Sequence, residues 1–284
     1  MEILHTASSV REFAQSRRSA GETIGFVPTM GAFHEGHLTL MRRAKAESGH
    51  CVVSLFVNPT QFRPGEDFDR YPRDLEKDSG LAESAGVDVL FVPAVEEIYP
   101  SGPTVTVRVD ELGDRWEGAR RPGHFDGVAT VCAKLFNIVL ADRAYFGQKD
   151  YQQLKVIRRL VAALHVPTEI VPVPTVRESD GLALSSRNIY LSRDERAAAP
   201  DIYRALQAAH DRFRSGERSS EIVIRAARDT LADKEQVSED YIDIAESESL
   251  VPLEVIDRSA VILIAARVGT TRLLDNIYLE FDPG

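Results

Sequence analysis

Two histidines on either side of a glycine are the residues of this chain best suited to bind phosphate. His34 and His37 flank Gly36 in the segment PTMGAFHEGH (28–37), which follows the apolar run TIGFV (23–27). A strand that leads through a glycine-containing turn into a helix is where open α/β sheets bind phosphates, because backbone N–H groups and the positive helix end face the ligand. Two imidazoles on the first helical turn would add donors aimed at the same phosphates. The alternative interpretation is a turn before a helix that carries surface histidines.

A second polar segment follows the next apolar run. NPTQF (58–62) places Asn58 and Gln61 at the carboxyl end of a predicted strand, where open sheets bind their ligands. Asparagine beside proline is also ordinary turn chemistry, so a plain turn remains the alternative.

Two later segments carry cations that could contact phosphate. GQKD (147–150) opens a helix, and lysine at a helix start is electrostatically unfavourable unless an anion is bound there, so Lys149 is expected to contact a phosphate. Asp150 could cap that helix, bind a ribose or do both, and Gln153, one turn into the helix, is by default a solvated glutamine. SSRN (185–188) combines two hydroxyls with a guanidinium, which suits a phosphate clamp, although by itself it could be any loop.

Composition restricts the class of protein. A chain of 284 residues with 43% hydrophobic and 27% charged residues is typical of a globular enzyme with one large and one smaller domain. The net charge of −10 argues against binding to nucleic acid or to an anionic membrane surface. No secretion signal or run of about 18 apolar residues is present, which predicts a cytoplasmic protein. Cys51 and Cys132 lie in separate apolar runs, so we expect buried, reduced thiols.

Strand-like and helix-like patterns alternate over the first 175 residues. This alternation predicts a Rossmann-like, doubly wound parallel sheet with helices on both faces. The expected strands cover 23–28, 51–57, 88–92, 143–147 and 168–173, with a more exposed strand at 104–109, and the expected helices cover 9–19, 36–48, 73–85, 126–139 and 154–164.

The pattern changes after residue 175. Two helices (193–215 and 219–233) precede three strands (240–246, 260–267 and 272–281), which predicts a smaller α+β domain. We therefore expect domains at 1–175 and 176–284, with a hinge in the proline-rich segment 171–175.

The chemistry-bearing segments together resemble a known family. H-x-G-H, a downstream lysine and a late Ser/Arg loop are similar to the HxGH nucleotidyltransferase superfamily, which includes class I aminoacyl-tRNA synthetases. The fuller set of strings resembles the pantoate–β-alanine ligase (pantothenate synthetase) family. Small departures are Phe33, where that family usually has leucine, and Leu184, where methionine is common. The matching strings are PTMGAFHEGH, FVNPTQF (56–62), YPRD (71–74), RPGHFDGV (121–128), FGQKDYQQL (146–154), TVRESDGLALSSRN (175–188) and TRLLDNI (271–277).

The resemblance implies an ATP-dependent ligase that uses Mg²⁺ and is a homodimer with a C-terminal lid domain. Pantoate would be activated as pantoyl adenylate with release of pyrophosphate, and β-alanine would then displace AMP. The implied catalytic residues are His37, His34, Lys149 and Arg187. The implied ATP-binding residues are Met30, Gly31, Ala32, Phe33, His34, Glu35, Gly36, His37, Gly147, Gln148, Lys149, Asp150, Val176, Leu184, Ser185, Ser186 and Arg187. Gln61 and Gln153 would bind pantoate, with Asn58 near the α-phosphate or the incoming amine.

Two alternatives remain at this point. A related nucleotidyltransferase would transfer a nucleotide and stop, and a nucleotide- or RNA-binding module would not turn over. The acidic balance argues against RNA as a partner. The sequence assigns no metal ligand and no role to Arg121 or His124.

Overall fold

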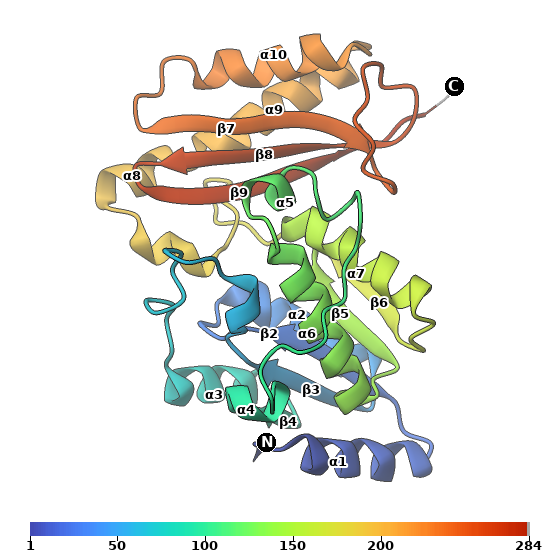
Figure 1. Cartoon of the computed structure of the whole chain (residues 1–284). Helices are drawn as coiled ribbons and strands as arrows, with labels where there is room; N and C mark the ends of the chain where they lie inside the picture. Colours follow the sequence, from blue (N-terminus) through green and yellow to red (C-terminus); the bar gives the residue numbers. More distant parts are fainter. Residues whose placement is uncertain (283–284) are drawn as a thin grey trace. The chain divides into compact units, whose positions relative to one another are not determined.

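The protein consists of two compact units in the computed structural model, which describes residues 1–282 (Figure 1). The N-terminal unit comprises Met1–Gln148 and Gln152–Pro174, and the C-terminal unit comprises Lys149–Tyr151 and the chain from Thr175 onward. By their contacts, Lys149–Tyr151 therefore belong to the C-terminal unit. A single domain boundary after residue 175 would place them in the N-terminal domain.

The N-terminal unit is built on six parallel strands in the order β1-β4-β3-β2-β5-β6. The order reverses at β2, because the chain moves outward through β3 and β4 on one side and through β5 and β6 on the other. Ligands of open sheets bind beyond the carboxyl ends of the strands at such a switch point, which here follows β2 and β5. The strands are β1 (Glu2–Leu4), β2 (Ile24–Thr29), β3 (His50–Leu55), β4 (Val89–Phe91), β5 (Arg143–Gly147) and β6 (Glu169–Val173).

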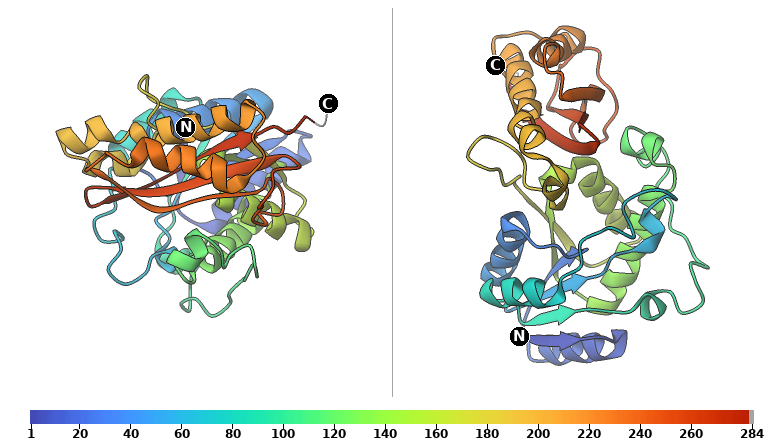
Figure 2. Two further views of the ribbon diagram at one scale, coloured as in Figure 1. Left: turned by 90° about the horizontal axis from the view of Figure 1, so that it is seen from above. Right: turned by 90° about the vertical axis from the view of Figure 1, so that its left-hand side faces the viewer.

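Helices cover both faces of this sheet, because successive strand residues point to opposite sides. Val27 and Tyr145 pack in one core with residues of α2 and α3, whereas Phe26 and Phe146 make ring contacts with Phe136 of α6. The right-hand view of Figure 2 shows the strands between α2 and α3 on one side and α6 on the other. The long helices of this unit are α1 (Ala7–Ser19), α2 (Glu35–Glu47), α3 (Leu75–Ser84), α6 (His124–Val139) and α7 (Tyr151–Ala163), and the short ones are η1 (Pro59–Gln61), α4 (Val95–Ile98), α5 (Glu117–Arg120) and η2 (Gln148–Asp150).

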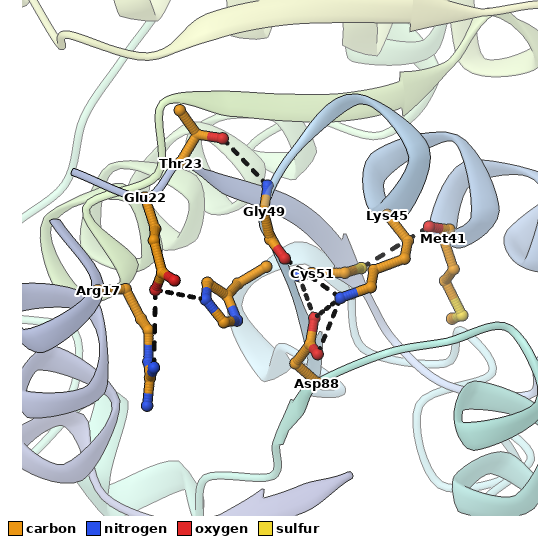
Figure 3. A network of polar contacts seen from close by, with 9 residues as sticks. Arg17, Glu22, Thr23, Met41, Lys45, Gly49, Cys51 and Asp88 are labelled. Atoms are coloured by element: carbon orange, nitrogen blue, oxygen red, sulfur yellow. Dashed lines mark hydrogen bonds and ion pairs between the residues drawn. The ribbon is translucent and has the colours of Figure 1, made fainter. Parts of the chain in front are cut away.

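A polar network anchors the carboxyl end of α2 at the amino ends of the strands (Figure 3). Lys45 pairs with Asp88 at 2.8 Å, and Asp88 also accepts a hydrogen bond from the backbone N–H of Cys51 at 2.7 Å. The Gly49 N–H donates to the Thr23 hydroxyl at 3.1 Å. These bonds join the end of α2 to β3 and to the turns before β2 and β4, so they help to set the direction in which the other end of α2 points.

The C-terminal unit has an antiparallel sheet in the order β7-β8-β9. Alternate residues of β8, such as Ile262 and Ile264, join Leu206 of α9 and Val223 of α10 in one buried core. Its elements are η3 (Ser186–Tyr190), α8 (Arg193–Ala198), α9 (Asp201–Arg214), α10 (Ser220–Leu231), β7 (Val237–Glu246), β8 (Ala260–Val268) and β9 (Thr271–Leu279). The predicted fold class is confirmed: a Rossmann-like parallel sheet and a smaller α+β unit.

Two local predictions are wrong, and one strand was missed. Residues 104–109 belong to neither sheet, and the Val107 N–H donates instead to the Thr130 hydroxyl at 2.9 Å. The expected helix over 193–215 is two helices, because Pro200 has no N–H and its ring clashes with the carbonyl group four residues earlier. Strand β1 was not predicted, since three residues carry too little periodicity to detect.

Two further expectations concern the cysteines and membrane-spanning helices. Cys51 is fully buried and Cys132 is 5% exposed, and both are free thiols. Burial raises the pKa of each thiol to about 12. Over residues 1–282, every helix is too short or too polar to cross a bilayer.

Candidate active site

The two histidines of the H-x-G-H segment cap the amino end of α2. His34 is the N-cap residue, and its Nδ1 accepts a hydrogen bond from the Gly36 N–H at 3.2 Å. The His37 Nδ1 in turn accepts from the His34 N–H at 3.4 Å. The two ring centroids are 4.1 Å apart. The imidazoles therefore form a reciprocal capping box in which His37 lies on the first helical turn and His34 lies just before it.

This capping arrangement determines the tautomer of both rings. A backbone N–H can only donate, so the Nδ1 atom that it meets in each ring carries no hydrogen. Each ring is then neutral and has its hydrogen on Nε2. A neutral Nε2–H can donate a hydrogen bond to a phosphate oxygen, which suits charge stabilisation better than transfer of a proton.

Asp78 of α3 holds the turn that precedes these histidines. Its carboxylate is 1% exposed and accepts hydrogen bonds from the N–H groups of Ala32 and Phe33, both at 2.8 Å. Ala32 has a φ of 53° and Gly31 a φ of 87°, a conformation that costs free energy for a residue with a side chain. Burial raises the pKa of Asp78, and the two N–H bonds oppose this effect. Asp78 therefore stabilises a strained turn.

Five backbone N–H groups of this turn, which was expected to face a phosphate, have partners within the protein. The N–H groups of residues 32, 33, 34, 36 and 37 all donate within the protein. The imidazoles of His34 and His37 stay the predicted phosphate donors of this segment.

Gln61 lies against the same segment. Its Nε2 contacts the Met30 Sδ at 2.8 Å, and its Oε1 accepts from the Asn58 Nδ2 at 3.1 Å. The structure thus places Met30, Gln61 and Asn58 in contact with one another along one line of side chains. Asn58, however, is 1% exposed, and both ends of its amide have protein partners.

Arg121 and His124, which the sequence left without a role, hold the backbone of Gln61. The His124 Nδ1 donates to the Gln61 carbonyl oxygen at 2.8 Å, and Arg121 donates to the same oxygen at 3.2 Å. Arg121 also donates to the His124 Nε2 at 3.1 Å and pairs with Glu66. Burial, followed by the positive charge of Arg121, lowers the pKa of His124 to about 4. His124 is therefore a neutral, structural histidine.

A second group of predicted residues lies in the C-terminal unit. Lys149 and Ser185 line one small pocket, whose walls are mostly apolar and which also includes Asp275. The Asn276 side chain donates to the Lys149 carbonyl oxygen at 2.8 Å. Arg177 pairs with Asp275 through two hydrogen bonds of 2.6 and 2.8 Å and stacks on the Tyr203 ring at 3.8 Å.

Several other residues predicted to bind ATP are also neighbours in this unit. The Leu184 N–H donates to the Val176 carbonyl at 3.0 Å, across a hairpin that turns at Gly181, where φ is 97°. The Ser185 hydroxyl then caps η3 by accepting from the Arg187 N–H at 3.3 Å. The turn at 178–181 aligns the two sides of the hairpin.

The remaining predicted residues follow β5. Gly147 ends that strand, and Gln148 begins η2. Gln153 is partly exposed on α7, beside the buried Gln152, whose amide bonds the carbonyl groups of Leu112 and Arg115. The adjacent glutamines therefore have different environments, and Gln153 is the one with access to solvent.

Several supporting residues were missed in the sequence. Asp78, Tyr99, Arg177 and Asn276 position site residues through contacts with segments that are distant in sequence. Only Asp78 had a signal, because it lies on the buried face of its helix with Ala82, one turn later, where a charge is unusual. Across residues 1–282, no three His, Cys, Asp or Glu side chains gather as a metal site would require.

Comparison with known proteins gives one consistent result. The family model described as "Pantoate-beta-alanine ligase" matches residues 2–278. A pantothenate synthetase of Moorella thermoacetica is 51% identical over 280 residues, which are 99% of each chain. The crystal structure of the Thermus thermophilus enzyme has a TM-score of 0.93 at 51% identity and covers 98% of this chain and 99% of its own. The Francisella tularensis ligase, complexed with beta-gamma ATP and beta-alanine, has a TM-score of 0.79 at 35% identity over all of both chains. This chain therefore belongs to the pantoate–β-alanine ligase family.

Proposed function

We propose that this enzyme uses ATP to condense (R)-pantoate with β-alanine and forms pantothenate, AMP and pyrophosphate. The observation that carries the proposal is the family match over residues 2–278, supported by the full-length similarity to a ligase in complex with an ATP compound and β-alanine.

The proposed chemistry has two steps. A carboxylate oxygen of pantoate attacks the α-phosphorus of ATP, the bond from that phosphorus to the bridging oxygen breaks, and pyrophosphate leaves. The amine of β-alanine then attacks the acyl carbon of pantoyl adenylate, the bond to AMP breaks, and the nitrogen loses a proton. A free carboxylate is a poor electrophile, so the adenylate supplies the leaving group. Positioning and charge stabilisation are the protein's main tasks.

The two groups of site residues fit these tasks. The neutral imidazoles of His34 and His37 would donate to phosphate oxygens through Nε2, and Lys149 and Arg187 would stabilise the charge that moves to pyrophosphate. Met30–His37 would lie along ATP, and Gln61 and Gln153 would bind pantoate. Gly147, Gln148, Asp150, Val176, Leu184, Ser185 and Ser186 complete the proposed ATP contacts.

Magnesium would enter with the nucleotide and neutralise phosphate charge. Mg²⁺ bound to ATP keeps several water molecules and takes phosphate oxygens as ligands, so it does not require a dedicated protein cage.

Three broader properties are part of the same proposal. The N-terminal unit would bind nucleotide and pantoate, the C-terminal unit would act as a lid, and the enzyme would be a cytoplasmic homodimer. Analytical ultracentrifugation tests the dimer, and crystal structures with and without nucleotide test the lid, since an unchanged angle between the units would exclude closure.

The reaction itself is tested by omission. The purified protein is incubated with ATP, Mg²⁺, D-pantoate and β-alanine, and each component is left out in turn. We expect pantoate-dependent ATP–pyrophosphate exchange without β-alanine, and release of AMP only when β-alanine is added. Exchange without any later release of AMP would identify a plain nucleotidyltransferase, and the absence of both activities would exclude the ligase.

A further inference from the structure

The amide of Asn58 is surrounded by groups of fixed polarity. Its Oδ1 accepts hydrogen bonds from the Thr60 N–H at 3.3 Å, the Thr60 hydroxyl at 2.9 Å and the Tyr99 hydroxyl at 2.9 Å. Its Nδ2 donates to the Gly127 carbonyl at 3.1 Å. A backbone N–H can only donate and a backbone carbonyl can only accept, so the two backbone groups fix which end of the amide is oxygen.

The position of the Gly127 carbonyl depends on a close approach of α6 to η1. A Cβ atom at Gly127 would lie 2.4 Å from the Thr60 carbonyl oxygen and 2.8 Å from the Gln61 nitrogen, closer than any real contact. Glycine at this position lets the two backbones touch and keeps the carbonyl group within reach of Asn58. The polarity of Asn58 is therefore a consequence of how these two elements pack.

The orientation of the Asn58 amide also determines the orientation of the Gln61 amide. The second Nδ2 hydrogen of Asn58 is directed at the Gln61 side chain, so the atom that it meets at 3.1 Å must be the acceptor Oε1. Nε2 is then at the other end of the Gln61 amide, where its partner is the Met30 Sδ. A thioether is a weak acceptor, and an oxygen of a ligand would be a better partner for these N–H groups.

We infer that Asn58, with Tyr99 behind it, is a positioning residue that holds Gln61 as a hydrogen-bond donor, so that Gln61 selects an acceptor oxygen of the substrate. The inference rests on the proposed function, in which Gln61 contacts pantoate, whose carboxylate and hydroxyl oxygens both accept. It also changes the role of Asn58, which orients a substrate-binding residue and does not itself touch the substrate.

Asn58→Asp tests this inference because it keeps the shape of the side chain and removes the donor. The carboxylate still accepts from Thr60 and Tyr99, but Gln61 must now turn its own NH₂ group toward residue 58 and present Oε1 to the substrate. We expect the kcat/KM for pantoate to fall by about 10- to 100-fold, the loss typical of an unsatisfied buried polar group, with the KM for ATP changed by less than about threefold.

A double-mutant cycle with Gln61→Ala separates positioning from direct contact. If Asn58 acts through Gln61, Asn58→Asp lowers the kcat/KM for pantoate by less than about threefold in the Gln61→Ala background. An equal loss in both backgrounds would overturn the inference, as would a wild-type kcat/KM in the single variant. Asn58→Ala is measured in the same cycle. Its coupling to Gln61→Ala is used in place of that of Asn58→Asp if the aspartate variant is not folded, as shown by the lack of a cooperative unfolding transition. A wild-type enzyme without pantoate-dependent turnover would instead refute the proposed function.

Discussion

Replacement of His124 by asparagine should weaken the dependence of stability on pH. In the folded protein His124 is neutral, because it donates to the Gln61 carbonyl from Nδ1 and accepts from Arg121 at Nε2. Its pKa is lowered from 6.5 to about 4, first by burial and then by the charge of Arg121. Asparagine can still donate to the Gln61 carbonyl, but it does not titrate.

The sign and the size of the pH effect on the free energy of unfolding follow from this pKa. Between pH 6.5 and about 4 the unfolded chain binds a proton at His124 and the folded protein does not, so the free energy of unfolding falls as the pH falls. At about 1.4 kcal/mol per pKa unit, the full effect is about 3 kcal/mol, present above pH 6.5 and lost by about pH 4.

The assay is urea unfolding at pH values from 4 to 8, followed by the fluorescence of Trp116, the single tryptophan of the chain, which is buried in the same unit. The difference in unfolding free energy between pH 7 and pH 4 should be about 3 kcal/mol smaller in His124→Asn than in the wild type. His165→Asn is a matched control, since His165 is exposed and its φ of 51° suits asparagine. Equal pH profiles for wild type and His124→Asn would refute the account of His124.

Five further substitutions test the turn, the helix cap and the proposed catalytic residues. Asp78→Asn can accept from only one of its two N–H donors, so the free energy of unfolding should fall by about 1.5–3 kcal/mol in urea titrations, and an unchanged midpoint would contradict the role given to Asp78. His34→Asn keeps an N-cap acceptor but lacks the Nε2–H, so it should retain stability to within about 0.5 kcal/mol, whereas His34→Ala should lose about 1 kcal/mol; equal losses would exclude the capping role. His37→Ala and Lys149→Ala should each slow adenylate formation by on the order of 10²–10³, measured by rapid quench, and rates near wild type would exclude the assigned roles.

The parallel sheet could be predicted because its central strands are continuous apolar runs. Residues 51–53 of β3 are fully buried, as expected for a strand covered on both faces. Pro200 was visible in the sequence, and its effect on a long predicted helix could have been anticipated. The prediction of a strand at 104–109 is wrong although alternating Thr and Val residues fit a strand pattern. A strand also needs a neighbouring strand to pair with, and such pairing depends on tertiary structure.

The sequence predicted candidate site residues, but it did not predict the residues that support them. The spacing of His34 and His37 predicted a helix start, yet their tautomers follow from which backbone N–H group meets which ring atom. Asn58 was predicted to bind a ligand because it follows a strand, and the inferred positioning role rests on its contacts with Tyr99 and Gly127. These partners are 41 and 69 residues away in sequence, so no local pattern encodes them.

The alkylation rates of the two buried thiols can report how often parts of the N-terminal unit open transiently. With a pKa of about 12, each has a thiolate fraction on the order of 10⁻⁵ at neutral pH, and alkylating reagents cannot reach it in the closed state. Labelling therefore requires a fluctuation that exposes Cys51 beneath α2 or Cys132 on α6. The ratio of the labelling rate to that of the unfolded chain measures how often each region of the N-terminal unit opens, without any added probe.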